Sequence, residues 1–207
     1  MKKIKFLNCR IDFSKKVFEP RIETEYWLEK AMKEIKGKNL NVLDIFSGSG
    51  CIGIAVLKNL GNSQVDFVDV DENALDEIKI NLKNNEIPSK RYRIIKSDLF
   101  ENLESEKYDV IFANPPYVAE RRMGEVDKDV LEQEPRIALF SGKEGLNHID
   151  KFLKKAKNYL TNDGLIYFEF DPKQKGAIRE ILEREGYHSF QFRKDQFGKY
   201  RWIKIAK

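Results

Sequence analysis

Short apolar runs alternate with longer amphipathic stretches along most of this 207-residue chain. The runs of strand length are residues 39–46, 64–70, 91–95, 108–113 and 164–170, and most are apolar on both faces, as buried parallel strands are. Helices are predicted over residues 22–35, 52–60, 74–84, 148–160 and 173–185. This alternation predicts an α/β fold, a doubly wound and mostly parallel sheet with helices on both faces.

The two ends of the chain follow a different pattern. Residues 187–193 and 200–205 are two strand-like runs joined by a short loop that contains Gly198, which predicts a hairpin and therefore one antiparallel strand. The alternating Ile4/Phe6 and Ile11/Phe13 predict a second hairpin. We therefore expect a hairpin extension over residues 1–20, followed by one domain over residues 21–207.

Composition narrows the class of protein. The chain is 41% hydrophobic and 35% charged, which suits a folded domain and is not typical of disorder. The longest uncharged run, Ile45–Leu57, contains three glycines and is too short to cross a bilayer. Two cysteines, Cys9 and Cys51, provide neither a disulfide framework nor a zinc site. With no secretory signal pattern, these features predict a cytoplasmic protein without a metal. The net charge of +4 permits a nucleic-acid partner but does not require one.

A glycine loop, LDIFSGSGCIGIAV over Leu43–Val56, joins a predicted strand to a predicted helix. Gly48 and Gly50 allow a tight turn and close approach of a ligand to the backbone, and with Gly53 they match the dinucleotide-binding spacing. Asp69 lies 19 residues beyond Gly50, after the next predicted strand, where its carboxylate can accept hydrogen bonds from both ribose hydroxyls. The ligand is predicted to carry adenosine, which NAD and S-adenosylmethionine share.

Two further positions favour S-adenosylmethionine over NAD. Asp44 precedes the loop, where a carboxylate would repel a pyrophosphate but tolerate a sulfonium amino acid. In SDLF, residues 97–100, Asp98 can accept from an adenine amino group and Leu99 can pack on the ring. Alternatively, Asp98 caps a short turn.

The NPPY sequence, residues 114–117, follows the fourth predicted strand. Prolines end a strand, so the simplest interpretation is a strand stop. The alternative is catalytic: Asn114 Oδ1 and the Pro115 carbonyl accept the two N–H bonds of a conjugated NH2 group, Pro116 keeps that carbonyl extended, and Tyr117 stacks on the flat substrate. Since parallel strands place their carboxyl ends at one edge, all four motifs are expected to share one crevice.

These motifs and their order resemble the HemK/PrmC family of protein-(glutamine-N5) methyltransferases. FEPRIETE at residues 18–25, EPRIALFSGKEGL at residues 134–146, EFDPKQ at residues 169–174 and KDQFGKYRW at residues 194–202 are similar to further segments of that family. The resemblance implies a class I, Rossmann-like fold with a seven-stranded sheet. It also implies methyl transfer to the glutamine of the GGQ loop of peptide-chain release factors.

By the same resemblance, the methionine end of the cofactor lies along Phe46, Ser47, Gly48, Ser49 and Gly50, Asp69 holds the ribose, Leu99 packs at the adenine, and the residues of NPPY hold the glutamine amide. The sequence departs from the family at Phe46, where glycine is common, and at Phe170–Asp171. The family's N-terminal helical domain is expected to be absent.

Two other functions remain open. NPPY also occurs in enzymes that methylate adenine N6 or guanine N2 of nucleic acids, and a cofactor-binding subunit that needs a partner chain is a third interpretation. His148 and His188 are expected to be structural or solvated, and Cys51 to be a small packing residue. Arg21 and Glu23 either orient a ligand or form an ion pair and a helix-terminal charge.

Overall fold

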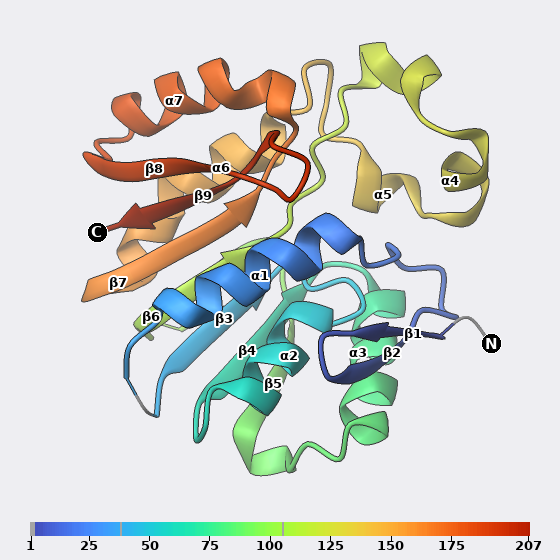
Figure 1. The fold of residues 1–207 in the computed structure, drawn as a ribbon, viewed down its shortest axis with the longest axis vertical. Helices are drawn as coiled ribbons and strands as arrows, with labels where there is room; N and C mark the ends of the chain where they lie inside the picture. The colour runs from blue at the N-terminus through green and yellow to red at the C-terminus, as the bar shows by residue number, and fades with distance from the viewer. Residues whose placement is uncertain (1–2, 38, 105) are drawn as a thin grey trace.

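The computed structural model describes residues 3–37, 39–104 and 106–207 (Figure 1). Its strands are β1 Lys3–Phe6, β2 Cys9–Asp12, β3 Asn41–Ile45, β4 Gln64–Asp69, β5 Tyr92–Lys96, β6 Tyr108–Ala113, β7 Leu160–Glu169, β8 Ser189–Lys194 and β9 Tyr200–Ala206. Its α-helices are α1 Ile22–Glu34, α2 Cys51–Asn59, α3 Glu72–Asn84, α4 Lys128–Gln133, α5 Arg136–Leu139, α6 Asn147–Ala156 and α7 Lys175–Arg184. No helix among the described residues is both long enough and apolar enough to cross a membrane.

The main sheet has seven strands in the order β5-β4-β3-β6-β7-β9-β8. Strands β3 to β7 pair in parallel, whereas β9 runs antiparallel to both of its neighbours. This confirms the predicted class I methyltransferase-like fold with one antiparallel strand. The chain winds outward from β3 through β4 to β5 and then returns to the other side of β3 as β6. The strand order therefore reverses between β3 and β6, which is where open α/β sheets bind ligands.

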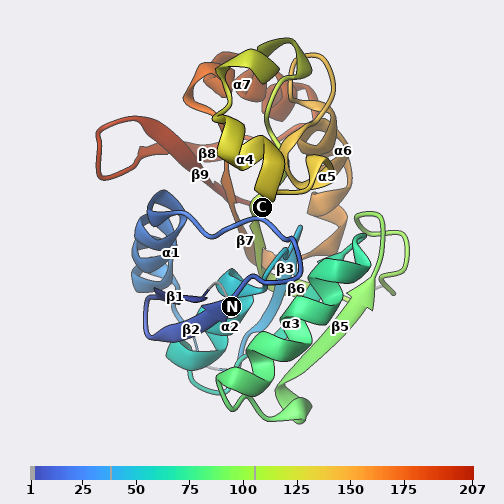
Figure 2. The same ribbon diagram turned by 90° about the vertical axis from the view of Figure 1, so that its right-hand side faces the viewer.

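Alternate residues of each central strand pack on opposite layers of helices. On one face, Val42 and Phe112 join a core with α1, α2 and α3, whose buried side chains include the predicted stripe of Ala74, Leu75, Ile78 and Leu82. On the other face, Leu43 and Ile111 join α6 and α7. Figure 2 shows α1 and α2 on one side of the sheet and α6 on the other. Burial on both faces explains why these strands are apolar throughout.

The predicted boundaries are wrong at a few positions. Arg91 belongs to a 3-10 turn and Phe46 to the glycine loop, so neither extends a strand. Leu160, predicted to end a helix, instead begins β7, because α6 ends at Ala156 and a 3-10 turn follows. The short helices α4 and α5 were not predicted; they lie beyond the carboxyl ends of the strands (Figure 1).

The N-terminal hairpin is present as β1 and β2, which pair antiparallel. Asn81 of α3 connects this hairpin to the rest of the fold. Its Oδ1 accepts from the Asp12 N–H at 2.7 Å. Its Nδ2 donates to the carbonyl of Asp12 at 2.7 Å and to that of Ser49 at 2.9 Å. One buried amide thus links the hairpin, helix α3 and the glycine loop. The division of the chain at residue 20 stays a prediction.

Candidate active site

A cavity of about 240 Å³ opens at the reversal of strand order between β3 and β6. The residues that follow β3, β4, β5 and β6 all contribute to its wall, as the sequence predicted. The predicted site residues among its lining are Phe46, Ser47, Gly48, Ser49, Asp69, Asp98, Leu99, Asn114, Pro115, Pro116 and Tyr117. Two predicted residues, Asp44 and Gly50, do not line it.

The glycine loop lies between the end of β3 and the start of α2. Gly48 and Gly50 have φ angles of 53° and 75°, in the left-handed region that side chains disfavour. A Cβ on Gly48 would meet no atom of the described residues within 4 Å, so this backbone borders open space. Ser47 ties the loop to β4, because its Oγ accepts from the Val68 N–H at 2.9 Å and lies 2.7 Å from the Asp44 carbonyl, to which it donates.

Asp69, at the end of β4, reaches back to this loop. Its Oδ2 accepts from the Gly48 N–H at 2.8 Å, and its Oδ1 accepts from the Asp71 N–H at 3.0 Å. Burial raises the pKa of Asp69, and the two backbone N–H groups partly offset this effect. Each carboxylate oxygen keeps a second acceptor site, which suits the two hydroxyls of a ribose.

Asp98 is an exposed carboxylate at the cavity wall. The turn that follows β5 is capped by Ser97 instead, whose Oγ accepts from the Asn102 N–H at 2.9 Å. Asp98 is therefore not needed as the turn cap and is free to accept from a ligand. Beside it, Leu99 is buried and has φ 54°.

Phe46 and Leu99 are both held in the left-handed region, Phe46 with φ 60°. Such a conformation costs on the order of 1 kcal/mol or more for a residue with a Cβ, and it persists where the surrounding structure fixes it. Phe46 packs edge-on against Phe152, with ring centroids 6.2 Å apart. The backbone at Phe46 thus turns as a glycine would, while its ring adds an apolar wall.

Asp44 and Gly50 lie behind the loop. Asp44 is fully buried; its Oδ2 accepts from the Gly53 N–H at 2.9 Å, and its Oδ1 has no hydrogen-bond partner among the described residues. Burial raises the pKa of Asp44 well above its usual value. Gly50 caps α2, and a Cβ there would lie 3.0 Å from Ile78 Cγ1. Neither residue lines the cavity, and the assignment of Asp44 and Gly50 to the cofactor site stays a prediction.

NPPY follows β6, and all four of its residues line the cavity. Asn114 and Tyr117 are partly exposed, whereas Pro115 and Pro116 are buried. Within the described part of the chain, no group hydrogen-bonds the side chain of Asn114, so its amide remains available to a ligand. The Tyr117 hydroxyl donates to the buried Glu169 at 3.0 Å. Burial raises the pKa of Tyr117 well above its usual value, so the phenol stays a neutral donor.

Several wall residues were not predicted. Val17, Phe18, Pro20 and Thr24 come from the segment before and within α1, and Pro135, Ile137, Ala138 and Leu139 come from α5 and the residue before it. Their apolar character gives no local pattern that separates them from core residues. The only signal in the sequence was the resemblance of both segments to the same family.

His148 was expected to be structural or solvated, and the structure places it in the cavity wall. Its Nδ1 is 2.7 Å from Ser141 Oγ, and its ring meets Phe46 edge-on at 6.0 Å. Burial lowers the pKa of His148, which keeps the ring neutral near pH 7. His188, by contrast, is exposed.

The structure places Cys51 as a buried packing residue and Arg21 in an ion pair, both of which were among the predicted roles. Burial raises the pKa of Cys51 strongly, as expected of a packing residue and not of a reactive thiol. Arg21 forms an ion pair with Glu134 and lies 4.7 Å over the Phe18 ring, and Glu23 stands in the first turn of α1. Neither Arg21 nor Glu23 is among the cavity residues.

Comparisons with known proteins agree with this geometry. A family model described as a methyltransferase small domain matches residues 10–142, more than half of the chain. A release factor glutamine methyltransferase from Rhodopirellula baltica is 35% identical over 98% of this chain and 70% of its own length. Another from Streptococcus pneumoniae is 36% identical over 97% of this chain and 71% of its own length. The chain belongs to the release factor glutamine methyltransferase family.

Members of this family are enzymes, and the chain is accordingly a methyltransferase. Its fold is also that of solved methyltransferases. A 16S rRNA N2 G1207 methyltransferase from T. thermophilus, in complex with AdoMet and guanosine, superposes with a TM-score of 0.70 at 20% identity, over 100% of this chain and 50% of that one. At that identity the likeness concerns the fold alone.

Proposed function

We propose that this methyltransferase moves the methyl group of S-adenosylmethionine to the side-chain amide nitrogen of the glutamine in the GGQ loop of a peptide-chain release factor. The observation that carries the proposal is one cavity with two different walls. One wall carries Asp69 and the glycine loop, and the other carries the free amide of Asn114 and the ring of Tyr117.

The cofactor wall fits an adenosine group. Asp69 offers acceptors to the ribose hydroxyls, Asp98 offers a carboxylate to the adenine amino group, and the open backbone at Gly48 leaves room for the methionine end. When bound, S-adenosylmethionine supplies an electrophilic methyl group on a positively charged sulfur. The unpaired Oδ1 of buried Asp44 lies behind this wall, on the side where a cation would be tolerated.

The NPPY wall fits a planar amide. In an amide the nitrogen lone pair is delocalised, so the nitrogen is a poor nucleophile. Asn114 Oδ1 and the Pro115 carbonyl accept its two N–H bonds, which fixes the nitrogen and raises its electron density. Tyr117 covers the flat face, where its ring favours the positive charge that develops on nitrogen. Holding the nitrogen in line with the methyl carbon is then the main catalytic device.

Binding and transfer are tested separately. Calorimetry compares S-adenosylmethionine with NAD; we expect binding of the first, and tight binding of NAD alone would contradict the cofactor assignment. A transfer assay with labelled cofactor then compares a purified release factor with DNA and RNA. Methyl transfer to the release factor glutamine supports the proposal.

Two other outcomes correspond to the alternatives. The NPPY sequence and the net charge of +4 favour a nucleic-acid substrate, which would appear as label on adenine or guanine. A need for a partner chain would appear as turnover only when cell extract is added. For the release factor as substrate, we place the enzyme in the cytoplasm, where translation ends.

A further inference from the structure

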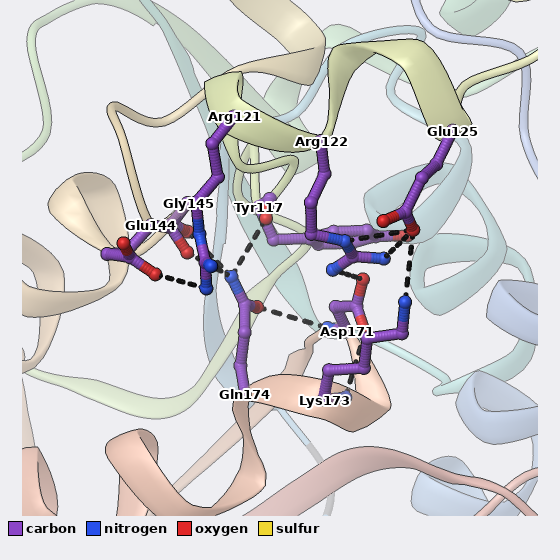
Figure 3. Close-up of polar contacts among 9 residues, drawn as sticks. All are labelled: Tyr117, Arg121, Arg122, Glu125, Glu144, Gly145, Asp171, Lys173 and Gln174. Carbon is purple, nitrogen blue, oxygen red and sulfur yellow. Dashed lines mark hydrogen bonds and ion pairs between the residues drawn. The ribbon is translucent and has the colours of Figure 1, made fainter.

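Tyr117 is held at both of its ends by one segment, residues 169–174. At the ring end, the Tyr117 hydroxyl donates to Glu169 Oε1 at 3.0 Å. At the backbone end, Gln174 Nε2 donates to the Tyr117 carbonyl at 2.9 Å. Glu169 and Gln174 are both buried, with 1% and 6% of their surfaces exposed. Figure 3 shows Gln174 reaching up from the start of α7 to the chain at Tyr117.

Glu169 is itself fixed in place by two donors from α1. Its Oε2 accepts from Thr24 Oγ1 at 2.6 Å and from Trp27 Nε1 at 2.8 Å. An indole N–H can only donate, so this oxygen has a defined direction. The second oxygen therefore faces Tyr117 in a fixed orientation. The carboxylate of Glu169 therefore connects α1 to NPPY. Thr24 of α1 is also part of the cavity wall.

Gln174 gathers three carbonyl oxygens around its side-chain amide. Besides that of Tyr117, Nε2 lies 3.0 Å from the Gly145 carbonyl and 3.2 Å from the Glu144 carbonyl. Its Oε1 accepts from the Asp171 N–H at 3.3 Å in a capping box, which orients the amide. Gly145 has φ 76°, and a Cβ there would lie 2.2 Å from the Tyr117 carbonyl. The chain at Tyr117 thus has no room to shift toward this turn.

From these contacts we infer that Glu169 and Gln174 are positioning residues: they set the ring plane of Tyr117 and the path of the NPPY backbone, and thereby the slot that receives the substrate amide. Neither residue lines the cavity, so each acts through Tyr117. The inference rests on the proposed function, since it assigns Tyr117 to an amide substrate. It gives a purpose to the glutamine at the start of α7 and to the glycine at position 145, which the reaction itself does not use.

The first test is Gln174→Met, which keeps the side-chain volume but removes the donors. Three carbonyls lose their shared partner, and the NPPY backbone is free to shift. We expect kcat to fall by about tenfold to a hundredfold, because misplacement of a reacting group by roughly 1 Å costs that much. The dissociation constant for S-adenosylmethionine should be unchanged. Lys173→Met is the matched control, since the Lys173 side chain is exposed and its polar partner among the described residues is Glu125.

Glu169→Gln is a conservative variant that tests the hydrogen bond between residue 169 and the Tyr117 ring. In Glu169→Gln, the amide oxygen stays with Thr24 and Trp27, and the NH2 faces the Tyr117 oxygen, which can accept. The hydrogen bond to the Tyr117 hydroxyl is kept with donor and acceptor exchanged, so this variant should retain most of kcat. Glu169→Leu and Tyr117→Phe both remove the link and should each lower kcat.

The orientation of Tyr117 can also be measured without a substrate. The eight tyrosines are replaced by 3-fluorotyrosine, and the Tyr117 resonance is assigned by its loss in Tyr117→Phe. In Gln174→Met we expect this fluorine line to shift or broaden, while the lines of the other tyrosines stay in place. A folded Gln174→Met protein with the wild-type fluorine line and wild-type kcat would overturn the inference. If the wild-type enzyme transfers no methyl to a release factor, the proposed function fails, and the fluorine line alone still decides whether Gln174 fixes Tyr117.

Discussion

Asn114 is the residue on which the chemistry depends most. Asn114 lines the cavity and its side chain has no hydrogen-bond partner among the described residues, so its replacement breaks no hydrogen bond there. Asn114→Ala should leave the fold and the cofactor affinity nearly unchanged and lower turnover by roughly a hundredfold or more. Stopped-time methyl-transfer assays and calorimetry measure the two quantities separately. Full activity of the Ala variant would mean that NPPY serves only to end strand β6.

Asn114→Asp distinguishes which half of the amide is needed. Aspartate keeps an acceptor oxygen but loses the donor and adds a charge. If Asn114 acts by accepting from the substrate NH2, the Asp variant should retain more turnover than the Ala variant. Equal loss in both variants would mean that the Asn114 NH2 group must also donate.

We expect the affinity for the cofactor to depend on pH through the ionisation of Asp69. Its ionised carboxylate is the form that accepts from both ribose hydroxyls, and burial raises its pKa from the ordinary value of 3.8. Affinity should therefore be full at neutral pH and fall as the pH drops through this raised value, at a higher pH than for an exposed aspartate. Asp69→Asn should bind about tenfold or more weakly, because hydrogen bonds to a charged group contribute about 1.5–3 kcal/mol.

Calorimetric titrations of S-adenosylmethionine at several pH values provide the check. The Asp69→Asn variant is the control for Asp44 and His148, which also titrate near the cavity. Its affinity should lack the part of the pH dependence that Asp69 contributes. An identical profile in both proteins would remove Asp69 from ribose binding.

At the scale of elements, two glycines in helices are expected to respond in opposite directions. A Cβ on Gly53 of α2 would lie 2.3 Å from Phe67 Cε1 and 2.9 Å from Val65 Cγ1, so α2 could not stay this close to β4. Gly53→Ala should destabilise the fold by about 1–3 kcal/mol. No atom of the described part of the chain lies within 4 Å of the Cβ position of Gly176 in α7, and Gly176→Ala should stabilise the fold by about 0.5 kcal/mol through helix propensity. Urea unfolding of both variants measures this, and equal effects would contradict the packing argument.

Asn81 tests whether the N-terminal hairpin and the main sheet form one folding unit. Asn81→Ala leaves the backbone groups of Asp12 and the carbonyl of Ser49 without their buried partner. We expect a loss of at least 1–3 kcal/mol in the free energy of unfolding, since that is the cost of unpaired buried groups. Asn73→Ala, at an exposed position of the same helix, is the control. A single cooperative transition in wild type and variant is expected, and a separate early transition for residues 1–20 would show an independent extension.

The sequence predicted the elements and their order well because burial on both faces leaves continuous apolar runs, and the glycine loop and NPPY mark strand ends. It did not predict α4 and α5, which have only six and four residues, or the parts of the cavity wall that contain Thr24 and Ile137. Those residues are brought to the cavity by tertiary contacts that have no local period. The assignment of Asp44 to the cofactor stays a prediction: its Oδ2 accepts from the Gly53 N–H of α2, a contact that the sequence pattern did not indicate.

At the scale of the whole molecule, separate motifs converge on one tyrosine. Helix α1, the glycine at 145 and the start of α7 lie far apart in the sequence, yet they meet around Tyr117, α1 through Glu169.

The central claim is that this cavity methylates a glutamine side chain. The most direct measurement incubates the wild-type enzyme and the Asn114→Ala variant with S-adenosylmethionine and a purified release factor, digests the product and locates the added methyl group by mass spectrometry. We predict one methyl group on the glutamine of GGQ with the wild-type enzyme and roughly a hundredfold slower addition with the variant. Methylation of any other residue, of nucleic acid instead of the protein, or at equal rates by both enzymes would contradict the account.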